Sequence, residues 1–445
     1  MQMEDGRSIQ EALRLGKSMD IYYYTSDTTS KQSIPTVVDT RFYQNLTSLG
    51  AGSSTFIISV DQGVGDIILS ATLPTQVPEP GEGDINYLNL ALPRGWLYSL
   101  INRFSVRYGT SSQYFWTGAQ CLIENLREMP NPTTRDNLFA LGGAAMTSVS
   151  GENPFSGDNL TAYAYLNLPH NSPNGSLGKP NPFPSELIGQ PIVITLELND
   201  LKSIFSSTNA LGSVASAPSA LASSYFQVRQ VHAYDAGDLM KMPMGSVYSF
   251  PTKAFYQNEV QVRVGTVGSG GAIVTGPNPY SLSLTGFRNG QVRSIFFWVT
   301  KNSETTGVVS PAGPFAKNFT KYYLPTDIEL LYNGTVYYRT IGTGAQMWSL
   351  CNTETPPLLQ NTSFSINGAG ALVLTPTVSN WVEMPFSQVF EQLSGAHMYV
   401  AGKAIQNAVV NLQITLPDND NYTCHFVYSY NCALMIKDKS CEYAF

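Results

Sequence analysis

Hydrophobic positions in this chain form short runs or alternate with polar positions, and turn-forming residues separate one run from the next. After residue 40 the runs are rich in Val, Ile, Thr, Tyr and Phe, and Gly, Pro and Asn bound them. Typical runs occupy residues 55–60, 67–69, 192–196, 260–264, 295–299 and 409–414. Runs of this length and composition predict antiparallel strands of β-sandwiches rather than βαβ units.

Helical patterns are few. A capping box at residues 8–11 predicts a short N-terminal helix that ends near Gly16. A second capping box at residues 117–120 predicts a helix that Pro130 and Pro132 prevent from continuing. The predicted fold class is therefore all-β, with a short N-terminal helix and few short inserted helices.

Three short sequences occur twice, in the same order, in the two halves of the chain. They are Phe-Tyr-Gln-Asn at 42–45 and 255–258, Thr-Gly-Ala-Gln at 117–120 and 343–346, and Ile-Thr-Leu at 194–196 and 414–416. Their displacements (42 to 255, 117 to 343, 194 to 414) are all close to half of the 445 residues. Coincidence in a Gly- and Thr-rich chain is the alternative, but the common order and offset predict two copies of one β-sandwich.

The chain is predicted to divide into three parts. Glycine and proline cluster between residues 235 and 250, so the join between the two sandwiches is expected there. The expected parts are an N-terminal arm with the short helix at 1–34, a first sandwich at 35–240 and a second at 241–445. The Ser/Ala-rich stretch 203–224 lacks periodicity and is predicted to be a long surface loop.

Charge is scarce. The chain has 25 basic and 32 acidic residues, and charged residues make up 13% of it, about half of the roughly 25% typical of soluble domains. No Lys/Arg cluster exists to neutralise phosphates, so we expect no direct sequence-specific binding of nucleic acid. No apolar run is long enough to predict a membrane span, and no secretion signal is recognised at the N-terminus. The five cysteines, an odd and sparse set, favour folding in a reduced compartment.

The sequence contains no strong motif for a catalytic, cofactor-binding or metal site. No Walker A, nucleophile-elbow or His-Glu-x-x-His motif occurs. Cys424, His425, Cys432 and Cys441 suggest a metal site, but on one strand Cys424 and Cys432 would lie roughly 26 Å apart, too far to share an ion. The glycine-rich stretch 265–271 and the acidic stretches 79–84 and 418–421 are interpreted as loops. We therefore predict no catalytic residue, no cofactor, no metal and no enzymatic activity.

Seven Asn-x-Ser/Thr sequons are candidate glycosylation positions. They lie at Asn45, Asn159, Asn174, Asn318, Asn333, Asn361 and Asn421. In an Asn- and Thr-rich chain such sequons also arise by chance.

One run of residues resembles a known family. Residues 88–109, Leu-Asn-Leu-Ala-Leu-Pro-Arg-Gly-Trp-Leu-Tyr-Ser-Leu-Ile-Asn-Arg-Phe-Ser-Val-Arg-Tyr-Gly, are similar to a hallmark of the double jelly-roll major capsid proteins of tailless icosahedral DNA viruses. In that family a strand, a glycine bend and a second strand precede a short helix. Residues 190–198, 231–235, 327–334 and 424–436 resemble later strands of the two rolls, in order.

The resemblance implies a fold and a role. The fold would be two tandem eight-stranded jelly-roll sandwiches, and the role that of a structural virion protein, synthesised in the host cytoplasm. The implied partners are a homotrimer that forms a pseudo-hexagonal capsomer, neighbouring capsomers, minor capsid or penton proteins, and an internal membrane contacted through the N-terminal arm. The implied lineages are polinton-like or adintovirus-like elements, virophages and nucleocytoplasmic large DNA viruses.

Two other classes of protein remain alternatives. A viral penton or receptor-binding β protein shares the composition, but a penton usually needs only one roll. A secreted carbohydrate-binding or glycosidase β-sandwich would need a signal peptide and paired carboxylates or an aromatic platform, and none of these stands out.

Overall fold

The structure is a computed structural model of the 445-residue chain. It describes residues 17–18, 36–44, 52–58, 63–76, 86–111, 113–128, 132–147, 155–166, 168, 183, 185, 188, 190–207, 216–233, 248–262, 279–284, 291–305, 318–323, 327–332, 335–341, 359–366, 372–379, 381–385, 403–404, 410–415, 422–437 and 439–444.

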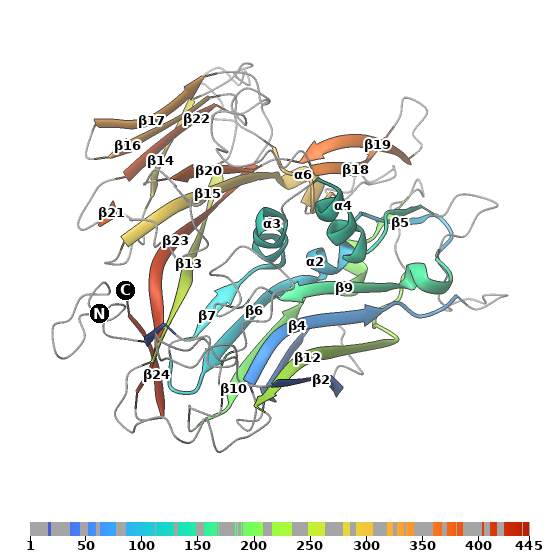
Figure 1. The fold of residues 1–445 in the computed structure, drawn as a ribbon. Coiled ribbons are helices and arrows are strands. Elements are labelled where there is room, and N and C mark those ends of the chain that lie inside the picture. The colour runs from blue at the N-terminus through green and yellow to red at the C-terminus, as the bar shows by residue number, and fades with distance from the viewer. Residues whose placement is uncertain are drawn as a thin grey trace.

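The first half of the chain forms a sandwich of two four-stranded antiparallel sheets (Figure 1). One sheet has the order β2 (Thr36–Gln44), β12 (Ser223–Ala233), β4 (Gly63–Thr72), β9 (Thr161–Leu166). The other has the order β3 (Gly52–Ile58), β10 (Ile192–Leu198), β6 (Ile101–Tyr108), β7 (Tyr114–Trp116). A small third sheet joins β11 (Ser206–Ser207), β5 (Leu90–Leu92) and β8 (Met146–Thr147).

The second half forms another sandwich. One sheet contains β13 (Tyr248–Val262), β23 (Tyr422–Lys437), β15 (Gln291–Lys301) and β20 (Val382–Pro385) in that order, and the other contains β14 (Pro279–Leu284), β22 (Val410–Thr415), β16 (Asp327–Tyr332) and β17 (Thr335–Ile341). Short strands extend the first of these sheets: β1 (Lys17–Ser18), β21 (Lys403–Ala404) and β24 (Ser440–Ala444). A separate hairpin comprises β18 (Leu359–Ile366) and β19 (Leu372–Ser379).

The two sandwiches have the same strand connectivity. Numbered along the chain with the short additional strands and the separate hairpin set aside, the first, eighth, third and sixth strands form one sheet of each sandwich, and the second, seventh, fourth and fifth form the other, in these orders. Two antiparallel four-stranded sheets with these crossovers are a jelly roll. The predicted all-β fold of two tandem eight-stranded jelly rolls is therefore confirmed.

The sequence repeats fall on equivalent elements. Phe-Tyr-Gln lies in β2 of the first roll and in β13 of the second, which are the first strand of each. Ile-Thr lies in the seventh strands, β10 and β22. Thr-Gly-Ala-Gln follows the fifth strands, β7 and β17, in the sequence. The repeats thus record the same duplication that the topology shows.

Alternation along the strands builds the core of the first roll. In β10, Ile192, Ile194 and Leu196 are buried, and the residues between them are partly exposed. The rings of Phe56 in β3 and Phe226 in β12 meet edge to face, 4.4 Å apart, between the two sheets. An antiparallel sheet with one face on a core gives this two-residue period.

Among the described residues, five helical segments of the first roll and one of the second interrupt the strands. They are α2 (Trp96–Leu100), α3 (Gly118–Glu128), α4 (Pro132–Leu141), the 3-10 turns η1 (Gly157–Leu160) and η4 (Leu201–Ile204), and α6 (Asn302–Thr305). The helix predicted after Thr117 is α3, and the Thr117 hydroxyl accepts a hydrogen bond from the Gln120 backbone N–H, 3.2 Å away. Pro132 then occupies the first position of α4, where its missing N–H costs nothing. No helix of the described residues is long and apolar enough to cross a bilayer.

The predicted surface loop 203–224 is wrong at both ends. Ile204 and Phe205 are buried, Ser206 and Ser207 pair with β5, and Leu221 is buried ahead of β12. Contacts with distant parts of the chain bury both ends of this segment, and the hydrophobic pattern within the segment carries no sign of them. The predicted helix at 8–16 and the join near 235–247 lie outside the described residues, so the domain limits 1–34, 35–240 and 241–445 remain predictions.

Backbone hydrogen bonds between the start of α2 and the glycines that follow α4 hold the bend before β6. Gly95, with φ 71°, is the N-cap residue of α2, and its N–H donates to the Gly143 carbonyl at 2.8 Å. The Leu97 N–H donates to the Gly142 carbonyl at 3.0 Å. A Cβ on Gly143, whose φ is 118°, would lie 2.2 Å from the fully buried Trp96 indole.

Gly143→Ala is expected to destabilise the chain by about 2–3 kcal/mol, because the methyl group overlaps Trp96 and the left-handed φ is strained. The thermal unfolding midpoint measures this. The matched control is Gly157→Ala, which has a φ of 57° but nothing within 4 Å of the new methyl group, so it should cost only about 1 kcal/mol. Equal shifts for the two variants would contradict the packing argument.

Candidate functional site: the junction between the two rolls

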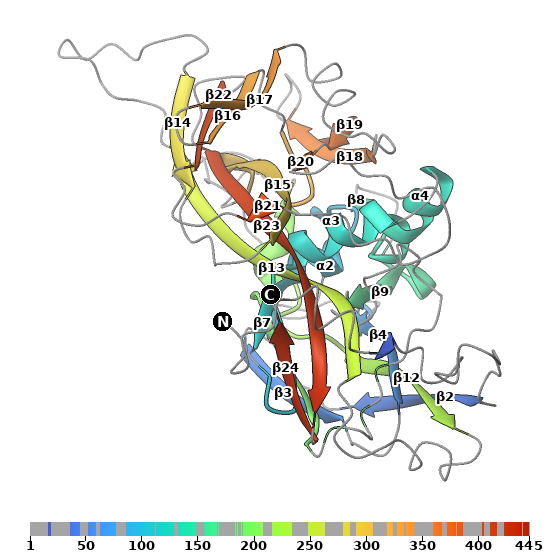
Figure 2. The same cartoon turned by 60° about the vertical axis from the view of Figure 1, so that its left-hand side comes forward.

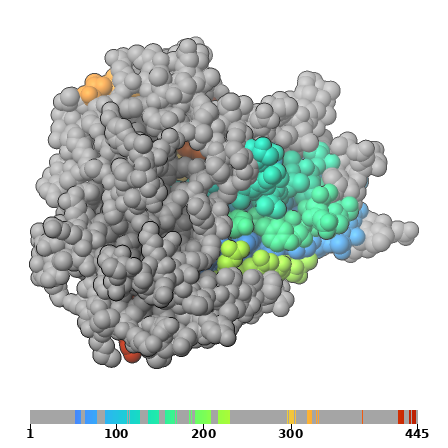
Figure 3. All heavy atoms as spheres, in the orientation of Figure 1, coloured from blue at the N-terminus to red at the C-terminus, as the bar shows by residue number. Residues whose placement is uncertain are grey.

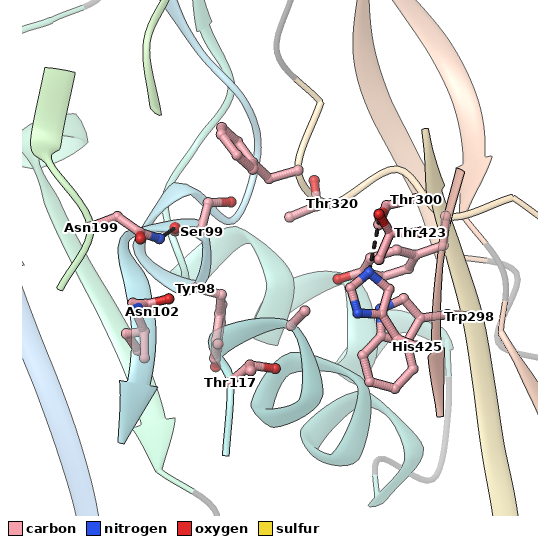
Figure 4. Close-up of a pocket in the computed structure, with 15 residues that line it drawn as sticks. Tyr98, Ser99, Asn102, Thr117, Asn199, Trp298, Thr300, Thr320, Thr423 and His425 are labelled. Carbon is pink, nitrogen blue, oxygen red and sulfur yellow. Dashed lines mark hydrogen bonds between the residues drawn. The ribbon is translucent and has the colours of Figure 1, made fainter. Parts of the chain in front are cut away.

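The two rolls meet where α2, α3 and the start of β6 face the second roll (Figure 1). An open pocket of about 280 Å³ marks this junction. Its lining comes from both halves of the chain: Tyr98, Ser99, Ile101, Asn102, Thr117, Gly118, Ala119 and Asn199 from the first roll, and Trp298, Thr300, Phe319, Thr320, Tyr322, Thr423 and His425 from the second (Figure 4). We call these fifteen residues the junction.

The first roll presents a closely packed backbone to the junction. A Cβ on Gly118 would lie 1.9 Å from the Tyr98 carbonyl oxygen and 2.7 Å from that of Ile101. Only glycine therefore allows α3 to begin directly against the C-terminal end of α2. The Asn199 amide donates to the Ser99 carbonyl at 3.0 Å and ties β10 to the same bend.

The second roll presents the outer face of its longer sheet. Trp298 of β15 and His425 of β23 are cross-strand neighbours, and their rings stack 5.1 Å apart with 9° between their planes. The His425 Nε2 and the Thr300 hydroxyl are 2.9 Å apart (Figure 4). Trp298 is only 1% exposed: Tyr322 of the same roll lies 6.4 Å from its ring, and Tyr98 and Gly118 of the first roll line the same pocket.

Direct hydrogen bonds also join the rolls. The Thr320 hydroxyl donates to the Arg94 carbonyl at 3.1 Å, just before α2. At the other end of the contact, Thr110 uses its hydroxyl to donate to the Cys441 carbonyl and to accept from the Cys441 N–H, both at 3.2 Å. Figure 2 shows the hairpin of β23 and β24 alongside the first roll. The β23–β24 hairpin of the second roll is thereby hydrogen-bonded to the first roll.

Arg94 is fixed from the first-roll side. Its guanidinium forms an ion pair with Asp136 at 2.7 Å, donates to the Asp136 carbonyl at 2.9 Å and lies 5.0 Å from the centre of the Phe139 ring. The backbone carbonyl that receives Thr320 is therefore held by α4 as well as by α2.

None of the fifteen junction residues is Asp, Glu, Lys or Arg. Burial raises the pKa of the Tyr98 and Tyr322 hydroxyls, so both stay protonated near neutral pH. Within the described part of the chain, no group of three or more His, Cys, Asp or Glu is placed to hold a metal ion. The chemistry that this arrangement supplies is packing and hydrogen bonding between two rolls.

Comparison with solved structures finds similar folds that extend over almost the whole chain. A chain of the PBCV-1 virus capsid matches with a TM-score of 0.59 and 11% identity, covering 94% of this chain and 99% of that one. The Faustovirus major capsid protein matches with a TM-score of 0.54 and 10% identity, covering 92% of both chains. The mavirus major capsid protein matches with a TM-score of 0.51 and 11% identity, covering 94% of this chain and 92% of that one.

This chain has the double jelly-roll fold of viral major capsid proteins. No protein-family model matches its sequence, and a search of curated proteins finds no relative. At 10–11% identity the likeness lies in the backbone arrangement of the two rolls.

The double jelly roll separates the residues that suggested a metal site. Cys424 is buried in β23, and its neighbour His425 points to the junction on the other face of the sheet. Cys432 lies farther along the same strand, and Cys441 lies in β24. The stretches 79–84, 265–271 and 418–421 lie outside the described residues.

The sequons occupy different environments. Asn159 is exposed in η1, whereas Asn318 is only 2% exposed and leaves no room for a glycan in the folded chain. Asn361 lies in β18 opposite Thr377. Asn45, Asn174, Asn333 and Asn421 lie outside the described residues. Glycosylation at exposed positions such as Asn159 stays a prediction.

Residue patterns did not identify the junction as a site. Trp298 and His425 lie on different strands, 127 positions apart (298 to 425) in the sequence, and only the register of β15 and β23 makes them neighbours. One available signal was the repeat at 117–120, because Thr117, Gly118 and Ala119 all line the pocket.

Gly118→Ala is expected to destabilise the chain by at least about 2 kcal/mol, because the methyl group meets two backbone carbonyls that cannot move independently. The midpoint of thermal unfolding measures the loss. Thr117→Ser is the control, since it keeps the hydroxyl that caps the Gln120 N–H and should unfold close to the unaltered chain. A Gly118→Ala chain as stable as the unaltered one would contradict the close contact between Gly118 and the Tyr98 and Ile101 carbonyls.

Cys424 is expected to resist alkylation in the native chain. Burial raises the pKa of its thiol to about 12, so at pH 8 the reactive thiolate is scarce, and reactivity rises only as the pH approaches that value. Burial also raises the pKa of Cys441. Iodoacetamide treatment at pH 8 followed by peptide mass spectrometry should find both thiols unmodified in native protein and modified in urea. Rapid native labelling of Cys424 would contradict this placement.

Proposed function

We propose that this chain is the major capsid protein of an icosahedral DNA virus and acts by assembly. The observation that carries the proposal is the tandem pair of jelly rolls with one connectivity, joined through a buried contact. Proteins of similar structure include the Faustovirus and mavirus major capsid proteins and a chain of the PBCV-1 capsid.

Two similar rolls side by side give each copy two near-equivalent corners. Three copies around a three-fold axis then give six corners, a pseudo-hexagonal capsomer that can tile an icosahedral shell. The low proportion of charged residues, 13%, suits this role because the centres of large protein interfaces are depleted in charge. The homotrimer is thus the first partner proposed, and neighbouring capsomers are the second.

Further partners and properties belong to the same proposal. Minor capsid or penton proteins would contact the capsomers, and the arm at 1–34 would contact neighbours or an internal membrane. We expect no catalytic activity and no direct sequence-specific contact with nucleic acid, because Lys and Arg are few and scattered. The protein would be synthesised in the host cytoplasm and reside in the virion.

The purified full chain is expected to run as a stable trimer of three times 48.5 kDa. Size-exclusion chromatography with light scattering measures the mass, and negative-stain microscopy should show particles with six-cornered outlines. A penton or receptor-binding protein would give other outlines, and a carbohydrate-binding protein would bind or cleave glycans. A chain that is monomeric at all concentrations would contradict the capsomer proposal.

A further inference from the structure

The contact between the two rolls leaves part of the junction unfilled. Its open pocket has a volume of about 280 Å³, which is at the small end of the roughly 300–1,000 Å³ typical of ligand pockets. Figure 4 shows Ser99, Asn102 and Asn199 of the first roll on one side of this space, and Thr423 and His425 of the second roll on the other. The pocket therefore suits one small molecule that contacts both rolls.

The first roll lines the pocket with hydrogen-bond donors. Thr117, Gly118 and Ala119 lie at the start of α3, where backbone N–H groups have no partner within the helix. The Thr117 hydroxyl oxygen accepts from the Gln120 N–H, so its own hydrogen is left to donate. Asn102, the second residue of β6, adds an exposed side-chain amide.

The second roll contributes an acceptor and an aromatic ring. The Thr423 hydroxyl donates its only hydrogen to the Asn302 side-chain oxygen at 2.7 Å, so towards a ligand it acts as an acceptor. The Thr320 hydroxyl has likewise given its hydrogen to the Arg94 carbonyl. Phe319, which is partly exposed, supplies the aromatic ring.

One buried donor of the pocket lining is unpaired. Trp298 is 1% exposed, and its indole N–H has no hydrogen-bond acceptor in the described structure. Folded proteins pair nearly all such groups, either with other protein atoms or with bound oxygen. The unpaired N–H indicates that the junction holds a further oxygen atom, from water or from a ligand.

These groups select a neutral ligand that carries hydroxyl groups. None of the fifteen junction residues is Asp, Glu, Lys or Arg, so an ion would enter the pocket without a counter-charge. A hydrocarbon would leave the donors at the start of α3 unpaired. A hydroxyl both donates and accepts, so it can serve the donors of one roll and the Thr423 oxygen of the other. A sugar ring also has apolar C–H groups that can lie against Phe319.

We infer that the junction pocket binds one neutral pyranose, either a free monosaccharide or the terminal sugar of a glycan. Its hydroxyls accept from the start of α3 and from Asn102, and one of them donates to Thr423. The inference goes beyond the proposed capsomer and does not depend on it, because both sides of the pocket belong to one chain. A sugar bound in this place bridges the two rolls.

A panel of methyl pyranosides tests the inference on the full chain. Saturation-transfer NMR should detect binding of at least one of the methyl glycosides of glucose, galactose, mannose and N-acetylglucosamine. That sugar should also raise the thermal unfolding midpoint, because it binds only the folded chain. The corresponding uronate should bind at least about tenfold more weakly, because its charge is unpaired in the pocket. If no pyranoside binds, or if the uronate binds equally well, the inference is overturned.

Asn102→Ala locates the binding site. This change should weaken binding about fivefold, the effect of one lost hydrogen bond, and should leave the unfolding midpoint of the free chain unchanged because Asn102 is exposed. The matched control is Asn137→Ala, which removes another exposed asparagine amide. Asn137 lies on α4, which is at the surface of the molecule (Figure 3) and outside the pocket. Equal sugar binding by the two variants would place the sugar elsewhere and overturn the inference.

Protection of His425 gives a test that needs no variant. His425 is half-buried in the pocket, so diethyl pyrocarbonate should modify it in the free chain and modify it more slowly when the sugar is bound. Modification of Lys439, exposed in the turn between β23 and β24, should be the same in both samples. Peptide mass spectrometry measures both rates. Equal modification of His425 with and without bound sugar would contradict the proposed position.

Further arms separate the two sources of sugar and the two proposals. An oligosaccharide that ends in the selected pyranose binds as well as the methyl glycoside if the ligand is a glycan terminus, and fails to bind if the ligand is a free monosaccharide. A trimeric chain that binds no pyranoside overturns this inference alone. A monomeric chain that binds the sugar in the pocket overturns the capsomer alone.

Discussion

The structure depends on one packing constraint: the outer face of a sheet in the second roll is aromatic and must be covered. A sandwich buries only the inner face of each of its sheets, so the stacked Trp298 and His425 require another element above them. Tyr322 of the same roll and the α2–α3 region of the first roll surround this surface. Because Gly118 has no side chain, the two helical segments pack tightly enough to form one continuous cover.

The same constraint explains why the two rolls act as a unit. The Thr320 and Thr110 hydrogen bonds lie at opposite ends of the contact, and each joins a side chain of one roll to the backbone of the other. Neutral groups make these contacts, so no buried charge has to be compensated.

Much of the fold could be predicted from local pattern. The strand β10, with its strict alternation, and the capped helix α3 both lie where the sequence placed them. The duplication was also visible, because Phe-Tyr-Gln-Asn and its partners keep their order. The segment after Ile204 was mispredicted since its burial depends on pairing with β5, which is more than 100 positions away (91 to 206) in the chain.

Side-chain periodicity and turn chemistry act over a few residues, so the fold class and its duplication could be predicted from the sequence alone. The separation of Cys424 and Cys432 could be predicted as well, because a strand spaces its residues at about 3.3 Å each. The packing of the two rolls against each other could not be predicted in this way. That Trp298 and Tyr98 line one pocket depends on how the two sandwiches pack, and this packing joins residues far apart in sequence through backbone approaches such as the one at Gly118.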